Sequence, residues 1–165
     1  MACDFSVRCT GIAQLHYCAD SRTVSIVSKR HIPVAESVPV GKALSRIMDI
    51  FTNTTAPNAI KLVCRERVFI GHFADADRLL RLAGAADMTL WQLKEQNFIE
   101  YAVSTIKKCV TGNGRASKEE VASALEHFVG TQEYTSDDES DAVAVGLTFF
   151  IKEGYIDVPH TIAES

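Results

Sequence analysis

The chain lacks the features that would place it in a membrane or in a secreted, disulfide-bonded class. No apolar run reaches the roughly 18 residues that a membrane-spanning helix needs. The first residues contain no basic stretch followed by an apolar one, which argues against a secretion signal. The five cysteines are an odd number and include no Cys-x-x-Cys pair, so we expect neither a disulfide framework nor a zinc site, and a reducing cytoplasmic location.

Internal repeats and linker-like stretches are also absent from the 165 residues. Hydrophobic residues make up 47% of the chain and charged residues 23%, which is an ordinary globular composition and excludes a disordered or fibrous protein. We therefore expect one domain over residues 1–158, followed by a frayed tail at 159–165.

Positive charge is nearly missing from the last third of the chain. Residues 119–165 carry one Lys or Arg against eleven Asp or Glu, whereas residues 1–118 carry sixteen against ten. The net charge of −4 therefore hides a basic body joined to a strongly acidic segment. The acidic segment is either a solvated surface or a carboxylate cluster that binds cations.

The hydrophobic pattern predicts an α/β chain. Apolar and β-branched residues indicate strands, and Asp20-Ser21 has the composition of a hairpin turn. The predicted strands are 1–5, 10–18, 22–28, 59–64 and 98–103.

Apolar residues at helical spacing indicate helices, one of which opens with Ser117 and Glu120 as a capping box. The predicted helices are 40–52, 73–96, 117–129 and a last one opening at Asp137. This order is typical of a mixed sheet that starts antiparallel and continues through crossovers.

Four carboxylates stand where such a fold can gather them. Asp4 ends the first predicted strand, and Glu66 lies just past the strand 59–64. Asp138 and Asp141 are three residues apart on the last helix and share the face of Val145, which we expect to point inward. They are either ordinary surface charges or a cluster that holds two divalent cations, which can promote phosphodiester hydrolysis.

Short motifs surround these carboxylates. The first is Asp4-Phe5-Ser6-x-x-x-Thr10-Gly11, and the second is Arg65-Glu66-Arg67-Val68-Phe69. The stretch from Phe98 to Gly114 is followed by Ala116-Ser117-Lys118-x-x-Val121, and the last motif is Asp138-x-x-Asp141-Ala142-x-Ala144-x-Gly146. In this order and at these separations, they resemble the motifs of RuvC-type Holliday junction resolvases over about residues 4–151.

The resemblance implies an RNase H-like fold, with a five-stranded mixed sheet flanked by helices. It also implies a magnesium-dependent endonuclease, with manganese as a substitute, that acts as a homodimer on four-way or branched DNA. The setting would be the cytoplasm of a bacterium or of a phage-infected host. Carried over by position, the catalytic residues and metal ligands are Asp4, Glu66, Asp138 and Asp141.

The resemblance also indicates DNA contacts. Phe69 matches an aromatic that lies near the branch point and is expected to stack on bases. Lys107 or Lys108, and Lys118, match basic positions that face phosphate. We expect a basic surface beside the carboxylates, formed by Arg65, Arg67, Arg78, Arg81, Lys107, Lys108, Arg115 and Lys118.

Two features depart from the family pattern. Only three residues precede Asp4, where the family has several more, so the first strand is either short or incomplete in this chain. The overall acidic charge is unusual for a family that is mostly basic, and more salt-sensitive DNA binding is the expected consequence.

Two other functions are alternatives to the nuclease. A non-catalytic junction-binding module of the same fold is the main alternative, although all four carboxylates are retained. An actin-like or hexokinase-like ATPase opens with a similar phosphate loop, but 165 residues are too few for its two lobes.

The helix 73–96 is the expected dimer interface. It carries apolar residues on more than one side, whereas a helix buried on one face needs a single stripe. The surplus indicates a partner, unless both sides pack within the monomer. The residues concerned are Leu79, Leu80, Leu82, Met88, Leu90, Trp91 and Leu93.

Overall fold

The computed structural model describes residues 1–6, 8–35, 37–56, 59–68 and 73–158, the side chains of 73–75 excepted. A five-stranded sheet in the order β3-β2-β1-β4-β5 runs through the molecule. Strands β1 (Ala2–Asp4), β2 (Cys9–Cys18) and β3 (Thr23–Pro33) form an antiparallel meander, and β4 (Cys64–Glu66) and β5 (Ile99–Tyr101) continue from β1 in parallel. The predicted mixed sheet is confirmed.

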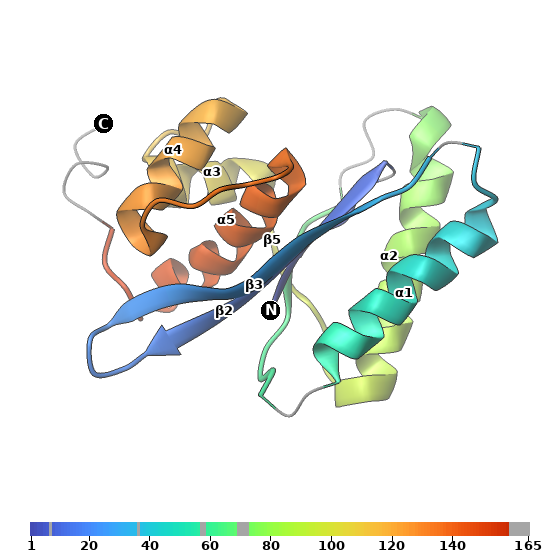
Figure 1. The fold of residues 1–165 in the computed structure, drawn as a ribbon, viewed down its shortest axis with the longest axis horizontal. Coiled ribbons are helices and arrows are strands. Elements are labelled where there is room, and N and C mark those ends of the chain that lie inside the picture. The colour runs from blue at the N-terminus through green and yellow to red at the C-terminus, as the bar shows by residue number, and fades with distance from the viewer. Residues whose placement is uncertain (7, 36, 57–58, 69–72, 159–165) are drawn as a thin grey trace.

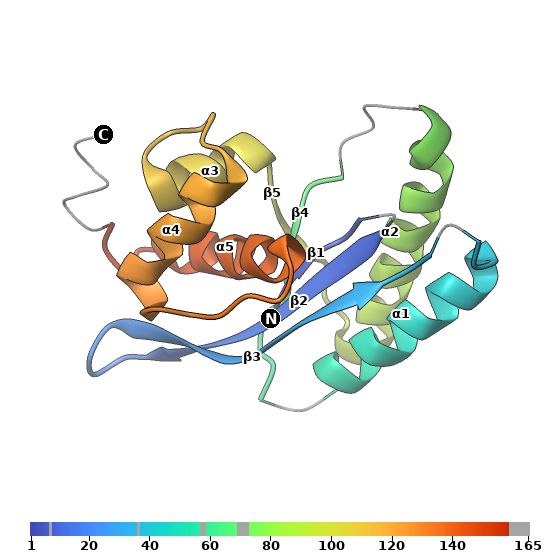
Figure 2. The same cartoon turned by 45° about the horizontal axis from the view of Figure 1, so that its top comes forward.

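Helices cover both faces of this sheet, as Figures 1 and 2 show. Helices α1 (Val40–Thr55) and α2 (Phe73–Lys94) pack on one face, and α3 (Val103–Thr111), α4 (Lys118–Val129) and α5 (Asp137–Lys152) cover the other. Each face has its own hydrophobic core, with Phe51 and Leu90 buried on the α1–α2 side and Leu125 and Val145 on the α5 side.

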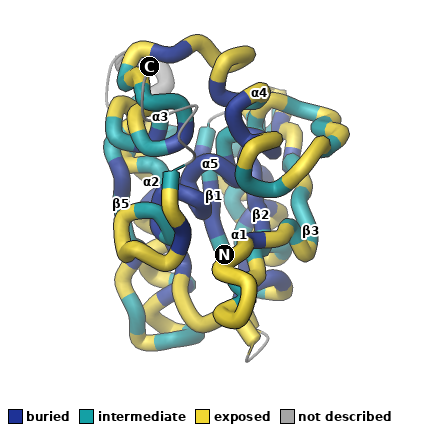
Figure 3. Tube along the Cα trace, turned by 90° about the vertical axis from the view of Figure 1, so that its left-hand side faces the viewer, coloured by how far each residue is buried: buried dark blue, intermediate teal, exposed yellow. Residues whose placement is uncertain are grey.

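Helix α5 is the most deeply buried helix among the described elements, and Figure 3 shows it beside the buried strand β1. Its approach to β2 is close enough to require glycine. A Cβ atom added at Gly11 would lie 1.8 Å from the carbonyl oxygen of Asp138, and one at Gly146 would lie 2.2 Å from Leu15 Cδ1. At Gly11 the close atom belongs to the backbone, so this glycine sets how near α5 comes to the sheet, whereas at Gly146 the Leu15 side chain would have to move.

The start of α4 follows the predicted capping chemistry, and the start of α5 has a cap that was not predicted. Ser117 accepts a hydrogen bond from the backbone N–H of Glu120, whose carboxylate accepts the N–H of Ser117 in return. Ser136 caps α5, whose first turn carries three acids where the helix dipole favours negative charge.

The strand expected at 59–64 is wrong in its position. Strand β4 begins only at Cys64, and Glu66 is its last residue rather than a residue beyond it. The reason is the lack of a partner, because β1 offers only Ala2 and Cys3 as parallel neighbours of Cys64 and Arg65. Residues 59–62 therefore stay mostly exposed despite their apolar composition.

Helix α3 was not predicted. Its β-branched residues favour a strand, and its N-cap, Ala102, offers no side-chain cap. Ile106 and Val110, four residues apart, are nevertheless buried together, and Gly112 ends the helix with a φ of 79°. The helix matters for function because it decides where Lys107 and Lys108 point.

Two expected absences can be compared with the structure. All five cysteines are free thiols. Among the described residues, no helix combines the length and the hydropathy that a membrane crossing requires. The tail expected to fray from Pro159 lies outside the described residues.

Candidate active site

The candidate site lies where three elements meet at one edge of the sheet. Strands β1 and β4 are parallel neighbours, so their C-terminal residues Asp4 and Glu66 reach the same edge. Asp141, on the second turn of α5, faces them across a cavity of about 290 Å³. Two lysines, Lys107 and Lys118, complete its charged lining.

The cavity walls are partly apolar. Val103 and Ile106 of α3 and Val121 of α4 line it together with Phe5. These side chains limit the water that can screen charges in the cavity, so the carboxylates interact more strongly there than on an open surface.

The pKa values of Asp4 and Glu66 are raised above those of ordinary carboxylates. Burial, with the negative charges of Glu66, Asp141 and Asp138, raises the pKa of Asp4 to about 8. Burial and the charge of Asp141 raise the pKa of Glu66 to about 6. The cavity therefore gathers carboxylates whose simultaneous ionisation the fold opposes.

Lys118 supplies part of the missing positive charge. Its ammonium nitrogen lies 3.0 Å from Asp141 Oδ2 and 3.9 Å from Asp137 Oδ2. Burial also raises the pKa of Asp141, while this hydrogen bond acts in the opposite direction. Lys118 thus stands as a counter-cation beside the carboxylates at the start of α4.

Asp138 lies near these groups but is turned to other partners. Its carboxylate accepts a 2.5 Å hydrogen bond from the Ser136 hydroxyl. Burial and Asp138 raise the pKa of the nearby Cys9 thiol to about 11. Asp138 is not among the residues that line the cavity, although its charge acts on Asp4 and Asp141.

The donor set fits a hard divalent cation. Carboxylate oxygens are the ligands that Mg²⁺ and Mn²⁺ prefer, and their mutual repulsion here is relieved by any cation placed between them. However, within the described part of the chain, no three His, Cys, Asp or Glu side chains have the arrangement of a ready-made metal centre. The four carboxylates therefore do not converge on one cation-sized point as expected, because Lys118 holds Asp141 and Ser136 holds Asp138.

Arg65 is not a DNA contact, and the expectation that it would be is wrong. Its side chain is 8% exposed, and its guanidinium pairs with Asp87 of α2 at 2.9 Å and with Glu100 of β5 at 2.6 Å. It also lies 4.5 Å above the ring centroid of Phe98. Because successive strand residues point to opposite faces, Glu66 faces the cavity while Arg65 is buried under α2.

The remaining basic residues of the expected DNA-binding surface differ in where they lie relative to the cavity. Arg67 and Arg115 are exposed, and Lys107 lines the cavity while its ammonium donates to the carbonyl oxygen of Ala116. Lys108, one position on, lies about 100° around the helix and lines a different recess with Ser104 and Lys152.

Arg78 and Arg81 contribute nothing to the cavity lining. Arg78 donates to the carbonyl oxygen of Val38, and Arg81 pairs with Asp77 along α2. Phe69 lies outside the described residues, so its contact with bases stays a prediction.

Two residues near the site, Ser6 and Gly11, could not be assigned individual roles from the sequence. Ser6 lines the cavity, and its hydroxyl donates to the Cys9 carbonyl, which shapes the loop after Asp4. Gly11 admits the backbone of Asp138. Both stand inside the first quoted motif, but their roles depend on contacts between distant segments.

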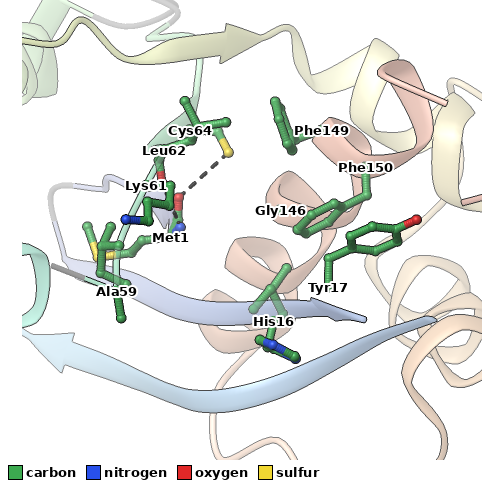
Figure 4. Close-up of a pocket in the computed structure, with 12 residues that line it drawn as sticks. Met1, His16, Tyr17, Ala59, Lys61, Leu62, Cys64, Gly146, Phe149 and Phe150 are labelled. Carbon is green, nitrogen blue, oxygen red and sulfur yellow. Dashed lines mark hydrogen bonds between the residues drawn. The ribbon is translucent and has the colours of Figure 1, made fainter. Parts of the chain in front are cut away.

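A second cavity, of about 250 Å³, lies further along α5 and is drawn in Figure 4. Phe149, Phe150 and Tyr17 line one side, and Met1 and Leu62 line the other. Its size matches that of the carboxylate cavity, but no Asp or Glu lines it. The clustered carboxylates therefore identify the chemical site, and the volume does not.

Comparison with known proteins gives a consistent result. The family model "Crossover junction endodeoxyribonuclease RuvC" matches residues 1–149. The RuvC of Chromobacterium violaceum is 32% identical over 136 residues, covering 82% of this chain and 72% of that protein. The RuvC of Rickettsia typhi is 32% identical over 111 residues, covering 64% of this chain and 71% of that protein.

Solved structures share the fold. The Thermus thermophilus RuvC structure solved with a Holliday junction substrate superposes with a TM-score of 0.80 at 19% identity, covering 93% of this chain and 94% of that one. The Fowlpox virus resolvase, also solved with Holliday junction DNA, superposes with a TM-score of 0.53 at 10% identity, covering 90% of this chain and 95% of that one.

The raised pKa of Asp4 predicts a pH-dependent gain in stability for Asp4→Asn. Between about pH 4 and pH 8 the folded state keeps a proton that the unfolded chain loses, so wild-type stability falls as the pH rises through this window. In chelator at pH 8, the variant should melt several degrees above the wild type, and this gain should shrink at pH 5. Asp20→Asn, in the exposed hairpin turn, is the control and should show no such gain. An equal melting temperature for Asp4→Asn and wild type at both pH values would contradict the prediction.

Proposed function

The chain belongs to the RuvC family of crossover junction endodeoxyribonucleases, and we propose that it cuts branched DNA at four-way junctions with divalent metal ions. The observation that carries the proposal is the cavity where Asp4, Glu66 and Asp141 gather beside two lysines. A buried, self-repelling carboxylate set suits cation binding, and adjacent ammonium groups suit a phosphate.

We assign the metal-holding role to Asp4, Glu66 and Asp141, with Asp138 joining once its side chain leaves Ser136. Bound magnesium or manganese would supply an activated water and would stabilise the leaving oxygen. Asp4 and Glu66 are the metal ligands with fixed positions, because both sit at the ends of hydrogen-bonded strands. The two aspartates on α5 are the ligands whose side chains have to move.

The lysines have separate tasks in this proposal. Lys107 projects into the cavity from α3 and faces the phosphodiester. Lys118 balances the charge of Asp141 before DNA arrives, and its 3.0 Å contact must loosen when a cation takes its place. Its ammonium is then free to contact phosphate from the same position.

We also propose that the active form is a homodimer, since two equivalent strands of a junction need two sites related by a two-fold axis. Helix α2 exposes Leu80, Met88 and Trp91, whereas Leu82 and Leu90 are buried within the monomer. Gly84 lies on the same exposed stripe, and a Cβ there would meet nothing within 4 Å in the monomer. A helix-interior glycine costs about 1 kcal/mol relative to alanine, which a close approach by a partner helix would explain.

Family membership and five free thiols support a reducing cytoplasm as the compartment.

The first prediction concerns the carboxylates. Glu66→Gln and Asp141→Asn should each lower junction cleavage by about 100-fold or more, because the metal loses a charged ligand. Junction affinity, measured by gel shift without metal, should stay within about twofold, since the phosphate contacts remain. Asp137→Asn is the matched control, because Asp137 is exposed one turn earlier on the same helix and lies outside the cavity.

Metal should also stabilise the wild-type fold. About 10 mM Mg²⁺ should raise its melting temperature by mass action, and the shift should be absent in Glu66→Gln. Wild-type cleavage by Glu66→Gln, or no shift in the wild type, would contradict the metal-site assignment.

The second prediction separates the two neighbouring lysines. Lys107→Gln removes a charge from the cavity, so the slope of log affinity against log salt should flatten by about 0.9. Lys108→Gln removes the same charge from a recess outside the cavity and should leave the slope unchanged. Equal slopes for the two variants would show that α3 does not present Lys107 to DNA.

The third prediction concerns assembly. Light scattering at micromolar concentration should give twice the monomer mass of 18.1 kDa. Trp91→Glu should restore the monomer, whereas Val27→Glu, an equally exposed site on β3, should not. Gly84→Ala distinguishes the dimer from the monomer. It should weaken a tightly packed dimer, whereas it should stabilise a helix that faces only water by about 1 kcal/mol.

A further inference from the structure

One buried carboxylate beside the site has no role in the chemistry proposed so far. Glu139 is 4% exposed, in a helix turn whose neighbours Asp137 and Asp138 are far more accessible. It does not line the cavity. Burying a carboxylate is costly unless it is fully paired, so its partners show what it holds together.

The Glu139 carboxylate joins three segments of the chain. Oε1 accepts a 2.7 Å hydrogen bond from the Thr135 hydroxyl and lies 3.1 Å from His31 Nδ1 of β3. Oε2 accepts the backbone N–H of Thr135 at 3.1 Å and lies 3.6 Å from Lys29 Nζ of β3. Lys29 in turn donates to the Glu133 carbonyl and lies over the Tyr134 ring. The first turn of α5 and the loop before it are thereby tied to the edge strand.

The Glu139 contacts lie on the same row of cross-strand register partners as Asp4, the first catalytic carboxylate. Asp4 on β1 is the register partner of Gly11 on β2, and Gly11 is the register partner of His31 on β3. The first turn of α5 crosses this row, with the Asp138 carbonyl against Gly11 and the Glu139 carboxylate against His31. Two contacts on one row fix both the height and the direction of that turn relative to Asp4.

We propose that Glu139 is a positioning residue, which clamps the first turn of α5 to β3 and so sets where Asp138 and Asp141 meet Asp4. The inference rests on the proposed function, because the two aspartates are assigned there as metal holders. Its physical basis is that Gly11 limits only how close α5 comes, whereas the Glu139 contacts resist its sliding or rotating away. A small displacement of catalytic groups is enough to cost a large part of the rate.

A metal-free measurement tests the clamp itself. Hydrogen exchange followed by mass spectrometry should show faster exchange at residues 136–141 in Glu139→Ala, about tenfold or more. Residues 143–150, the buried remainder of α5, should keep wild-type protection. Faster exchange along the whole helix, or no change in the first turn, would overturn the proposal, because Glu139 would then be a general stabiliser or would hold nothing.

Kinetics supply the functional readout. Glu139→Gln and Glu139→Ala should lower kcat about 10- to 100-fold and raise the Mg²⁺ concentration for half-maximal cleavage, with junction affinity unchanged. Thr135 offers a matched pair: Thr135→Val removes the hydroxyl donor and should show the same shift more weakly, and Thr135→Ser should restore wild-type values. A fall in melting temperature with wild-type kcat and metal dependence would overturn the proposal. Asp141→Asn run in parallel keeps the two ideas apart, because its inactivity upholds the metal site whatever the Glu139 variants do.

Discussion

The backbone contact between α5 and the sheet is the constraint on which the site depends. At Gly11 the helix backbone and β2 approach so closely that a single methyl group would not fit. This proximity lets aspartates on a helix reach the end of β1, the strand next to β2 in the sheet, where Asp4 stands. A helix held off by a side chain at position 11 would lie further from β2, and its carboxylates would lie further from Asp4.

Electrostatics then turn a packing arrangement into a chemical one. Placing Asp4, Glu66 and Asp141 around a partly apolar cavity raises the pKa of each, so the fold opposes their ionisation. Lys118 offsets part of this cost from the start of α4. The acidic last third of the chain is thus not uniform, since Asp137 is exposed, Glu139 is buried and paired, and Asp141 faces the cavity. These are three environments within five residues.

The order of strands and the main helices could be predicted because hydrophobic periodicity, caps and turns are local signals. The prediction that Asp4, Glu66 and Asp141 share one site depended on the family resemblance, because no local sequence pattern encodes contacts between distant segments. Errors occurred where tertiary context decides. The strand predicted at 59–64 was misplaced because β1 offers only two parallel partners. Helix α3 was missed because its β-branched residues favour strands. The burial of Arg65 was not foreseen because its partners Asp87 and Glu100 are distant in sequence. The burial of Glu139 was invisible for the same reason.

The Arg65 cluster has a consequence for how this sequence can change over time. Its buried guanidinium joins β4, α2 and β5 through two acids that are more exposed, one residue from Glu66. An unpaired buried charge costs several kcal/mol, so losing both acids would be far more costly than losing one. A substitution at Asp87 therefore makes Glu100 harder to replace, and the reverse holds, because each is then the remaining partner of Arg65 on the strand that carries Glu66.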